Sequence, residues 1–108
     1  MWLIDFEPVQ GAEMNKVRPA VVVSSDSVGR LPIKLVAPIT GWQAHFVGNV
    51  WHVRVEPTKS NGLSKESAVD ALQIRAVSIE RFRTRLGRLT ADQMEQIAAA
   101  IAIVVEHT

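Results

Sequence analysis

The sequence predicts a mainly β fold: a small, strongly bent sheet or barrel with one helix packed on it. Two observations support this fold class. Short apolar segments, several rich in Val, alternate with segments that contain Gly, Pro, Asn or Asp, which is typical of strands joined by turns. The C-terminal segment instead repeats its apolar residues at helical spacing. Five or six short strands and a single helix in 108 residues favour a compact β fold over a helical bundle.

The strands follow from the apolar segments in order. Residues 50–55 alternate apolar and polar side chains, whereas residues 20–24 are dense in Val and predict a strand buried on both faces, or nearly so. Together the expected strands are 1–6, 20–24, 33–39, 50–55, 67–72 and 74–77. The expected loops between them include 7–17, 25–32, 41–49 and 57–64.

The C-terminal helix has a clear start signal. Thr90 followed by Gln93 forms the pattern of a capping box, in which each side chain bonds the backbone of the other. Behind it, apolar residues recur every three or four positions and predict one buried helix face: Met94, Ile97, Ala98, Ile101, Val104 and Val105.

Composition restricts the classes of protein. The chain is expected to be one domain, residues 1–108, because this length suits a single core. It has no Cys, and its His residues match no metal motif, so no metal ion or cofactor is expected. Its apolar runs are too short to span a bilayer, and its first residues lack the basic region of a signal peptide. A soluble cytoplasmic protein is therefore expected.

Charge is distributed unevenly along the chain. The net charge is +1, yet residues 16–88 hold all twelve basic residues and five acidic ones, a balance of +7. Both flanking segments carry acids only. A basic centre suits a polyanionic partner, although scattered charge on a solvated surface is the alternative.

The first segment with chemical potential runs from Gly11 to Pro19 and contains Glu13, Lys16 and Arg18. Pro19 excludes Arg18 from the helical region, so its guanidinium is expected at the rim of the sheet. A fixed guanidinium presents a planar set of donors that suits phosphate oxygens. An ordinary surface salt bridge between Glu13 and Arg18 is the alternative.

Two later segments also carry polar side chains. Thr40 ends a strand, where its hydroxyl can donate to a phosphate oxygen or simply begin a turn. Gln73 and Arg75 are expected on one face of a strand, suited to reading a base edge or a phosphate, or to forming an ordinary exposed face. Trp42 and Phe46, in the loop 41–49, are suited to stacking on single-stranded bases or to a dimer interface, and the two remain open.

In this order, these segments resemble the MazF/PemK-like toxin family over nearly the whole chain. Residues 11–19 are similar to its G-x-E-x-x-x-x-R-P element, and residues 38–40 to its P-[IVC]-T element. Lys65, Glu66 and Ser67, followed by residues 73–75, resemble its K-[DE]-S and Q-[IV]-R elements. Leu72 replaces an acidic residue found in several relatives, a departure that bears on base specificity.

The resemblance implies an SH3-like or CcdB-like barrel with a C-terminal helix, assembled as a homodimer. It also implies metal-independent, sequence-specific cleavage of single-stranded RNA, chiefly mRNA, by the toxin of a toxin–antitoxin pair. The implied protein partner is a labile antitoxin whose acidic, apolar tail occupies the RNA groove, and no membrane is involved. Two alternatives stay open: a CcdB-like toxin that poisons a topoisomerase, and a non-catalytic SH3-like module that binds RNA or protein.

The chemistry of such cleavage needs few protein groups, because the 2′-hydroxyl of the RNA is the nucleophile. The products would be a 2′,3′-cyclic phosphate and a 5′-hydroxyl. Arg18 is expected to stabilise the phosphate, with Thr40 as a second donor and Glu13 as base or base reader. His45 and His52 are interpreted as structural or peripheral. The residues expected to bind RNA are Lys16, Trp42, Ser67, Gln73 and Arg75.

Overall fold

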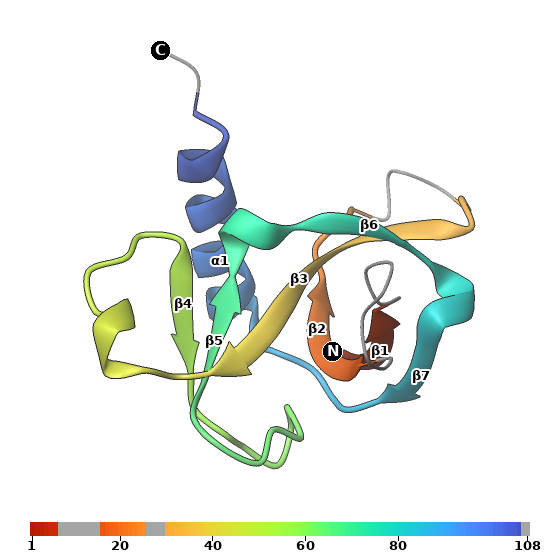
Figure 1. Cartoon of the computed structure of the whole chain (residues 1–108), viewed down its shortest axis with the longest axis horizontal. Coiled ribbons are helices and arrows are strands. Elements are labelled where there is room, and N and C mark those ends of the chain that lie inside the picture. Colours follow the sequence, from red (N-terminus) through yellow and green to blue (C-terminus); the bar gives the residue numbers. More distant parts are fainter. Residues whose placement is uncertain (7–15, 26–29, 107–108) are drawn as a thin grey trace.

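The computed structural model describes residues 1–6, 16–25 and 30–106 (Figure 1). They form a bent antiparallel sheet with one α-helix, so the expected mainly β class with a C-terminal helix is confirmed. The strands are β1 (Trp2–Phe6), β2 (Lys16–Val22), β3 (Ile33–Gly41), β4 (His52–Val55), β5 (Ser67–Asp70), β6 (Arg75–Ser78) and β7 (Phe82–Arg85). The helices are the 3₁₀ turns η2 (Ala44–Phe46), η3 (Ala71–Gln73) and η4 (Ile79–Arg81), and α1 (Ala91–Val104).

Strand β3 organises the sheet, whose order is β4-β5-β3-β2-β1-β7 with β6 paired to β3 off this path. The first half of β3 pairs with β6 on one side, and its last three residues pair with β5. Its middle pairs with β2, which in turn pairs with β1. Figure 1 shows β3 crossing the molecule between these neighbours. The sheet bends because one long strand exchanges partners along its length.

Two apolar clusters lie on opposite faces of strand β2. Val21 joins the cluster packed against α1, which includes Ile97 and Ala100, whereas Ala20 joins a second cluster with Ile4 and Phe6. Successive residues of a strand point to opposite faces, so β2 supplies both clusters. The expectation that this Val-rich strand is buried on both faces is confirmed at Ala20 and Val21.

The capping box at the start of α1 is also confirmed. The Thr90 Oγ1 accepts a hydrogen bond from Gln93 N at 3.1 Å, and Thr90 N donates to Gln93 Oε1 at 2.9 Å. These bonds satisfy backbone groups that a helix N-terminus otherwise leaves unpaired. None of the helices in the described ranges is long and apolar enough to cross a membrane.

Several element boundaries differ from those predicted. Strand β2 begins at Lys16 and not after Pro19, as was predicted. Residues 16–20 all pair with β1, so the strand continues through the proline. Strand β7 was not predicted, since only one of its four residues is apolar and most of it is exposed.

The prediction that Gln73 and Arg75 share a strand face is wrong. Strand β5 ends at Asp70, whose Oδ1 accepts from Leu72 N at 3.0 Å and turns the chain into η3. Gln73 therefore lies in a 3₁₀ turn, and β6 begins only at Arg75. A local side-chain bond to the backbone competes here with continued strand pairing.

Candidate functional site

A pocket of about 270 Å³ lies where β3 ends, beside β2 and the start of β5. Three separate parts of the chain converge there. Its lining residues are Arg18, Pro19, Ile39, Thr40, Gly41, Leu63, Ser64, Lys65 and Ser67. The structure thus brings together Arg18, Thr40 and Ser67, three residues of distant segments whose motifs predict one site.

Strand pairing explains how Thr40 and Gly41 of β3 reach the pocket. Thr40 lies opposite Ala68 and Gly41 opposite Ser67 in the β3–β5 ladder. On the other side, the Arg18 backbone is held within β2 opposite Ile4 of β1. Both Arg18 and Thr40 therefore project from paired strands, which fixes their backbones more firmly than a loop would.

Lys65 lines the pocket but is not among the site residues predicted from the sequence. Its side chain lies directly over Gly41: a Cβ on Gly41 would be 3.0 Å from Lys65 Nζ and 3.1 Å from its Cε. The signal in the sequence was its position two residues ahead of Ser67 in the family-like motif. Within the described part of the chain, neither Lys65 nor Arg18 has a carboxylate partner.

The turn ahead of Lys65 is held by a buried amide. Asn61 is 1% exposed, and its Oδ1 accepts from the backbone N–H groups of Thr58 and Leu63 at 2.9 and 3.0 Å. Its Nδ2 donates to the Glu56 carbonyl at 2.8 Å. These bonds fix a segment that carries Ser64 and Lys65 to the pocket, because they satisfy backbone groups that regular secondary structure does not.

Gln73 lies outside this pocket, at the opposite end of β5. Its Nε2 donates to Asp70 Oδ2 at 2.8 Å, and the His52 Nε2 is 3.8 Å from the same oxygen. The His52 Nδ1 is 3.1 Å from the Asn49 side-chain nitrogen. His52 is therefore part of a side-chain network that supports β4 and η3, and neither His52 nor His45 lines the pocket.

Arg75 also lies away from the pocket. Its guanidinium is 4.7 Å from the centre of the Phe6 ring, a cation–π contact between β6 and β1. Val36 of β3 is the Cα partner of Arg75. The two residues expected to share a strand face thus have different surroundings: Gln73 is bonded to a carboxylate and Arg75 is stacked on a ring.

Trp42 and Phe46 belong to an aromatic cluster next to β4. Their rings meet edge to face at 5.6 Å, and Phe46 stacks on His52 at 3.8 Å. The Arg54 guanidinium is 4.8 Å from the Trp42 ring and 2.8 Å from Glu66 Oε2. The hydrogen bond from Arg54 lowers the pKa of Glu66.

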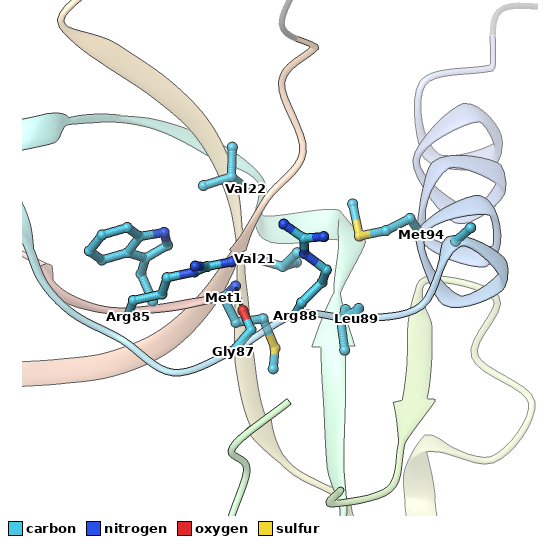
Figure 2. A pocket seen from close by; sticks show the side chains of 10 residues that line it. Met1, Val21, Val22, Arg85, Gly87, Arg88, Leu89 and Met94 are labelled. Carbon is cyan, nitrogen blue, oxygen red and sulfur yellow. Dashed lines mark hydrogen bonds between the residues drawn. The ribbon is translucent and has the colours of Figure 1, made fainter. Parts of the chain in front are cut away.

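A second pocket, of about 480 Å³, lies between β2, the segment after β7 and the start of α1. Figure 2 shows Arg85 and Arg88 beside Val21 and Val22, with Met94 projecting from α1. Burial, with the positive charges of Arg85 and Arg88, lowers the pKa of the Met1 α-amino group.

Two predicted site residues, Glu13 and Lys16, precede Arg18 in the chain. Glu13 lies outside the described residues, and so does the alternative salt bridge between Glu13 and Arg18. Lys16 begins β2, and only its backbone is described. Among the described residues, no three His, Cys, Asp or Glu side chains are grouped so as to hold a metal ion.

Comparison with known proteins identifies the family. Residues 1–105 match the model of the PemK-like, MazF-like toxins of type II toxin–antitoxin systems, and the chain belongs to this family. Endoribonuclease MazF9 of Mycobacterium tuberculosis is 30% identical over 110 residues, which cover 95% of this chain and 90% of that relative.

Solved structures agree with this assignment. Toxin MazF-mt6 of Mycobacterium tuberculosis superposes with a TM-score of 0.71 at 25% identity, covering 94% of each chain. A mycobacterial endoribonuclease in complex with its cognate antitoxin has a TM-score of 0.74 at 19% identity, covering 96% of this chain and 88% of that one, and shares the fold. The resemblance read from the motifs is confirmed.

Proposed function

We propose that this chain, as one domain over residues 1–108, is an endoribonuclease that cleaves single-stranded RNA in the pocket lined by Arg18 and Thr40. One observation carries the proposal: two cationic side chains, those of Arg18 and Lys65, converge with the hydroxyl of Thr40 on one pocket, and no described carboxylate neutralises the cations. The name of the relative MazF9 supports the same activity. A site of this composition suits a phosphodiester because it offers donors and positive charge to phosphate oxygens.

The reaction begins with attack of the RNA 2′-oxygen on the adjacent phosphorus. The guanidinium of Arg18 and the hydroxyl of Thr40 donate to the non-bridging oxygens, where negative charge increases in the pentacoordinate transition state. Because substrate and donors are held in place, positioning and charge stabilisation supply much of the catalysis. Cleavage leaves a 2′,3′-cyclic phosphate and a 5′-hydroxyl.

The remaining predicted residues keep their expected roles in this proposal. Glu13 acts as base or base reader. Lys16, Arg75 and Trp42 contact the RNA, and Gln73 reads a base edge. Ser67 has a narrower role, since it is 3% exposed and its hydroxyl donates to the Lys65 carbonyl at 2.9 Å. It holds the Lys65 backbone and leaves its oxygen lone pairs for the substrate.

The proposal also includes the partners of the toxin. The chain acts in the cytoplasm as a homodimer, on mRNA, and is inhibited by an antitoxin whose acidic tail occupies the RNA-binding surface. The mycobacterial relative solved with its cognate antitoxin supports such a partner. Topoisomerase poisoning and non-catalytic binding are less favoured, because neither requires Arg18, Lys65 and Thr40 to meet in one pocket.

The test is digestion of a long single-stranded RNA by the purified chain in EDTA, followed by mapping of 5′-hydroxyl ends. Cleavage at a defined sequence is expected, and Arg18→Ala, which should cleave far more slowly, serves as the matched control. A requirement for Mg²⁺ or Mn²⁺, or 5′-phosphate ends, would contradict the proposed mechanism. RNA binding without cleavage would instead favour the non-catalytic alternative.

A further inference from the structure

We infer that Lys65 is the general acid of the reaction and donates its proton to the departing 5′-oxygen. This inference rests on the proposed cleavage of RNA in the same pocket. It is based on the position of the Lys65 ammonium in the pocket and on the weaker acidity of the other groups that line it.

The backbone at Lys65 and Glu66 is held by two hydrogen bonds. Its own carbonyl accepts from the Ser67 hydroxyl at 2.9 Å, and the carbonyl of Glu66 accepts from Trp42 N at 3.0 Å. The Glu66 side chain is held by Arg54 at 2.8 Å. With the backbone anchored in this way, the Lys65 side chain lies along Gly41 and carries its ammonium into the pocket that also contains Arg18.

Breaking the P–O5′ bond places negative charge on the leaving oxygen, which needs a proton. A guanidinium does not release its protons in proteins, so Arg18 cannot supply one. The hydroxyls of Thr40 and Ser64 are weak acids, and the Ser67 hydroxyl already donates to a carbonyl. Among the described residues that line the pocket, Lys65 is the cationic group with a transferable proton.

The step balances without any further reactant. The 2′-oxygen forms a bond to phosphorus, and the 2′-hydroxyl proton passes to a base or to solvent. The P–O5′ bond breaks, its electron pair stays on O5′, and the Lys65 Nζ transfers one proton to that oxygen. Lys65 is left as a neutral amine and regains a proton from water before the next turnover.

Gly41 makes this placement possible. A Cβ at this position would lie 3.0 Å from Lys65 Nζ and 3.1 Å from its Cε, a contact so tight that the end of the lysine side chain would have to move aside slightly. Gly41 is not among the described glycines with a positive φ. A glycine suits this position because it has no side chain to contact Lys65. The Gly41→Ala variant therefore shifts the proton donor without removing it.

The experiment compares two RNA substrates under single-turnover conditions at saturating enzyme. One has the natural 5′-oxygen leaving group, and the other has sulfur in its place, which departs as a thiolate without protonation. Lys65→Ala is expected to slow cleavage of the natural substrate by about 10²- to 10⁴-fold, the usual contribution of a general acid. It should cleave the sulfur substrate nearly as fast as the unmodified protein does.

Three further variants complete the comparison. Lys65→Arg keeps the charge but not the transferable proton, so it should follow Lys65→Ala on both substrates. Gly41→Ala should give an intermediate loss on the natural substrate only. Arg18→Ala should slow both substrates alike, because it acts on the non-bridging oxygens. Circular dichroism of each variant checks that it is folded.

Equal slowing of both substrates by Lys65→Ala, or no slowing of either, would overturn the inference. Equal slowing would make Lys65 an electrostatic ligand of the phosphate and leave the proposed function intact. If the unmodified protein cleaves neither substrate, the proposed function itself is wrong. The two failures are therefore distinguishable.

Discussion

The two cations of the pocket differ from two arginines elsewhere on the sheet, Arg54 and Arg83. Arg54 is paired with Glu66 at 2.8 Å, and Arg83 with Asp5 at 2.9 Å. Arg18 and Lys65, in contrast, have no carboxylate partner within the described ranges. Paired cations satisfy groups of the fold itself, whereas unpaired cations in a concave pocket retain their charge for an external anion.

The two groups also differ in what their side chains contact. The backbone of Arg18 is held by the β1–β2 ladder, and that of Lys65 by the Ser67 hydroxyl. Arg54 and Arg83 also lie in strands, but their side chains are oriented by the carboxylates that they contact. Removal of a pocket cation should therefore reduce activity more than stability, and removal of a paired cation should do the reverse.

Among the arginines, the largest effect is expected for Arg18→Ala. Loss of a preorganised donor to the phosphate should lower the single-turnover rate by about 10²- to 10³-fold. Binding of an uncleavable 2′-deoxy analogue should weaken far less, since one contact is a small part of a polyanion interaction. Arg18→Lys should recover only part of the rate, because it restores charge without the planar donor geometry. Lost binding with an unchanged saturated rate would show that Arg18 only anchors the RNA.

Arg83→Ala should show the opposite behaviour. The Asp5 side chain is 12% exposed, and its Oδ1 is buried without a hydrogen-bond partner. Without Arg83, its Oδ2 loses a charged donor as well, which should lower the free energy of unfolding by about 1–3 kcal/mol. Urea denaturation measures this loss, and the cleavage rate at saturating enzyme should be retained. A stable but inactive Arg83→Ala variant would break the distinction between the two groups of cations.

Arg75→Ala tests an intermediate case, since this guanidinium is stacked on Phe6 and lines no described pocket. RNA affinity should fall at every sequence, and the slope of log affinity against log salt should decrease by about 1. The saturated single-turnover rate should change little. Affinity measured by fluorescence anisotropy at several salt concentrations provides the test, and a large loss of saturated rate would move Arg75 into the catalytic group.

The smallest effect is expected at the exposed pair of Arg54 and Glu66. The hydrogen bond from Arg54 lowers the pKa of Glu66, so Arg54→Ala should return that pKa toward its ordinary value. A carboxylate with a lowered pKa in the folded state stabilises the fold above its unfolded-state pKa, and this contribution is lost as the pH falls through the folded-state pKa. NMR titration of Glu66 in both proteins measures the shift. An unchanged pKa would show that Arg54 does not stabilise the Glu66 carboxylate.

Local signals in the sequence predicted much of this structure. The capping box of Thr90 and Gln93 and the apolar repeat behind it were enough to locate α1, because both depend on residues within a few positions of one another. Prediction failed where a side chain competed with strand pairing, as Asp70 does at the end of β5. It also failed at β7, where exposure leaves no alternation of apolar residues to detect.

The sequence by itself determined the fold class, the family and three of the residues that line the pocket: Arg18, Thr40 and Ser67. Their motifs could be recognised without knowing where they meet. Only the tertiary structure decided that Lys65 completes the pocket, that Gln73 lies at the far end of β5, and which cations are paired. Those outcomes depend on contacts between distant segments, such as Gly41 opposite Ser67 in the β3–β5 register. A one-residue shift of that register would turn every side chain of the strand to the other face.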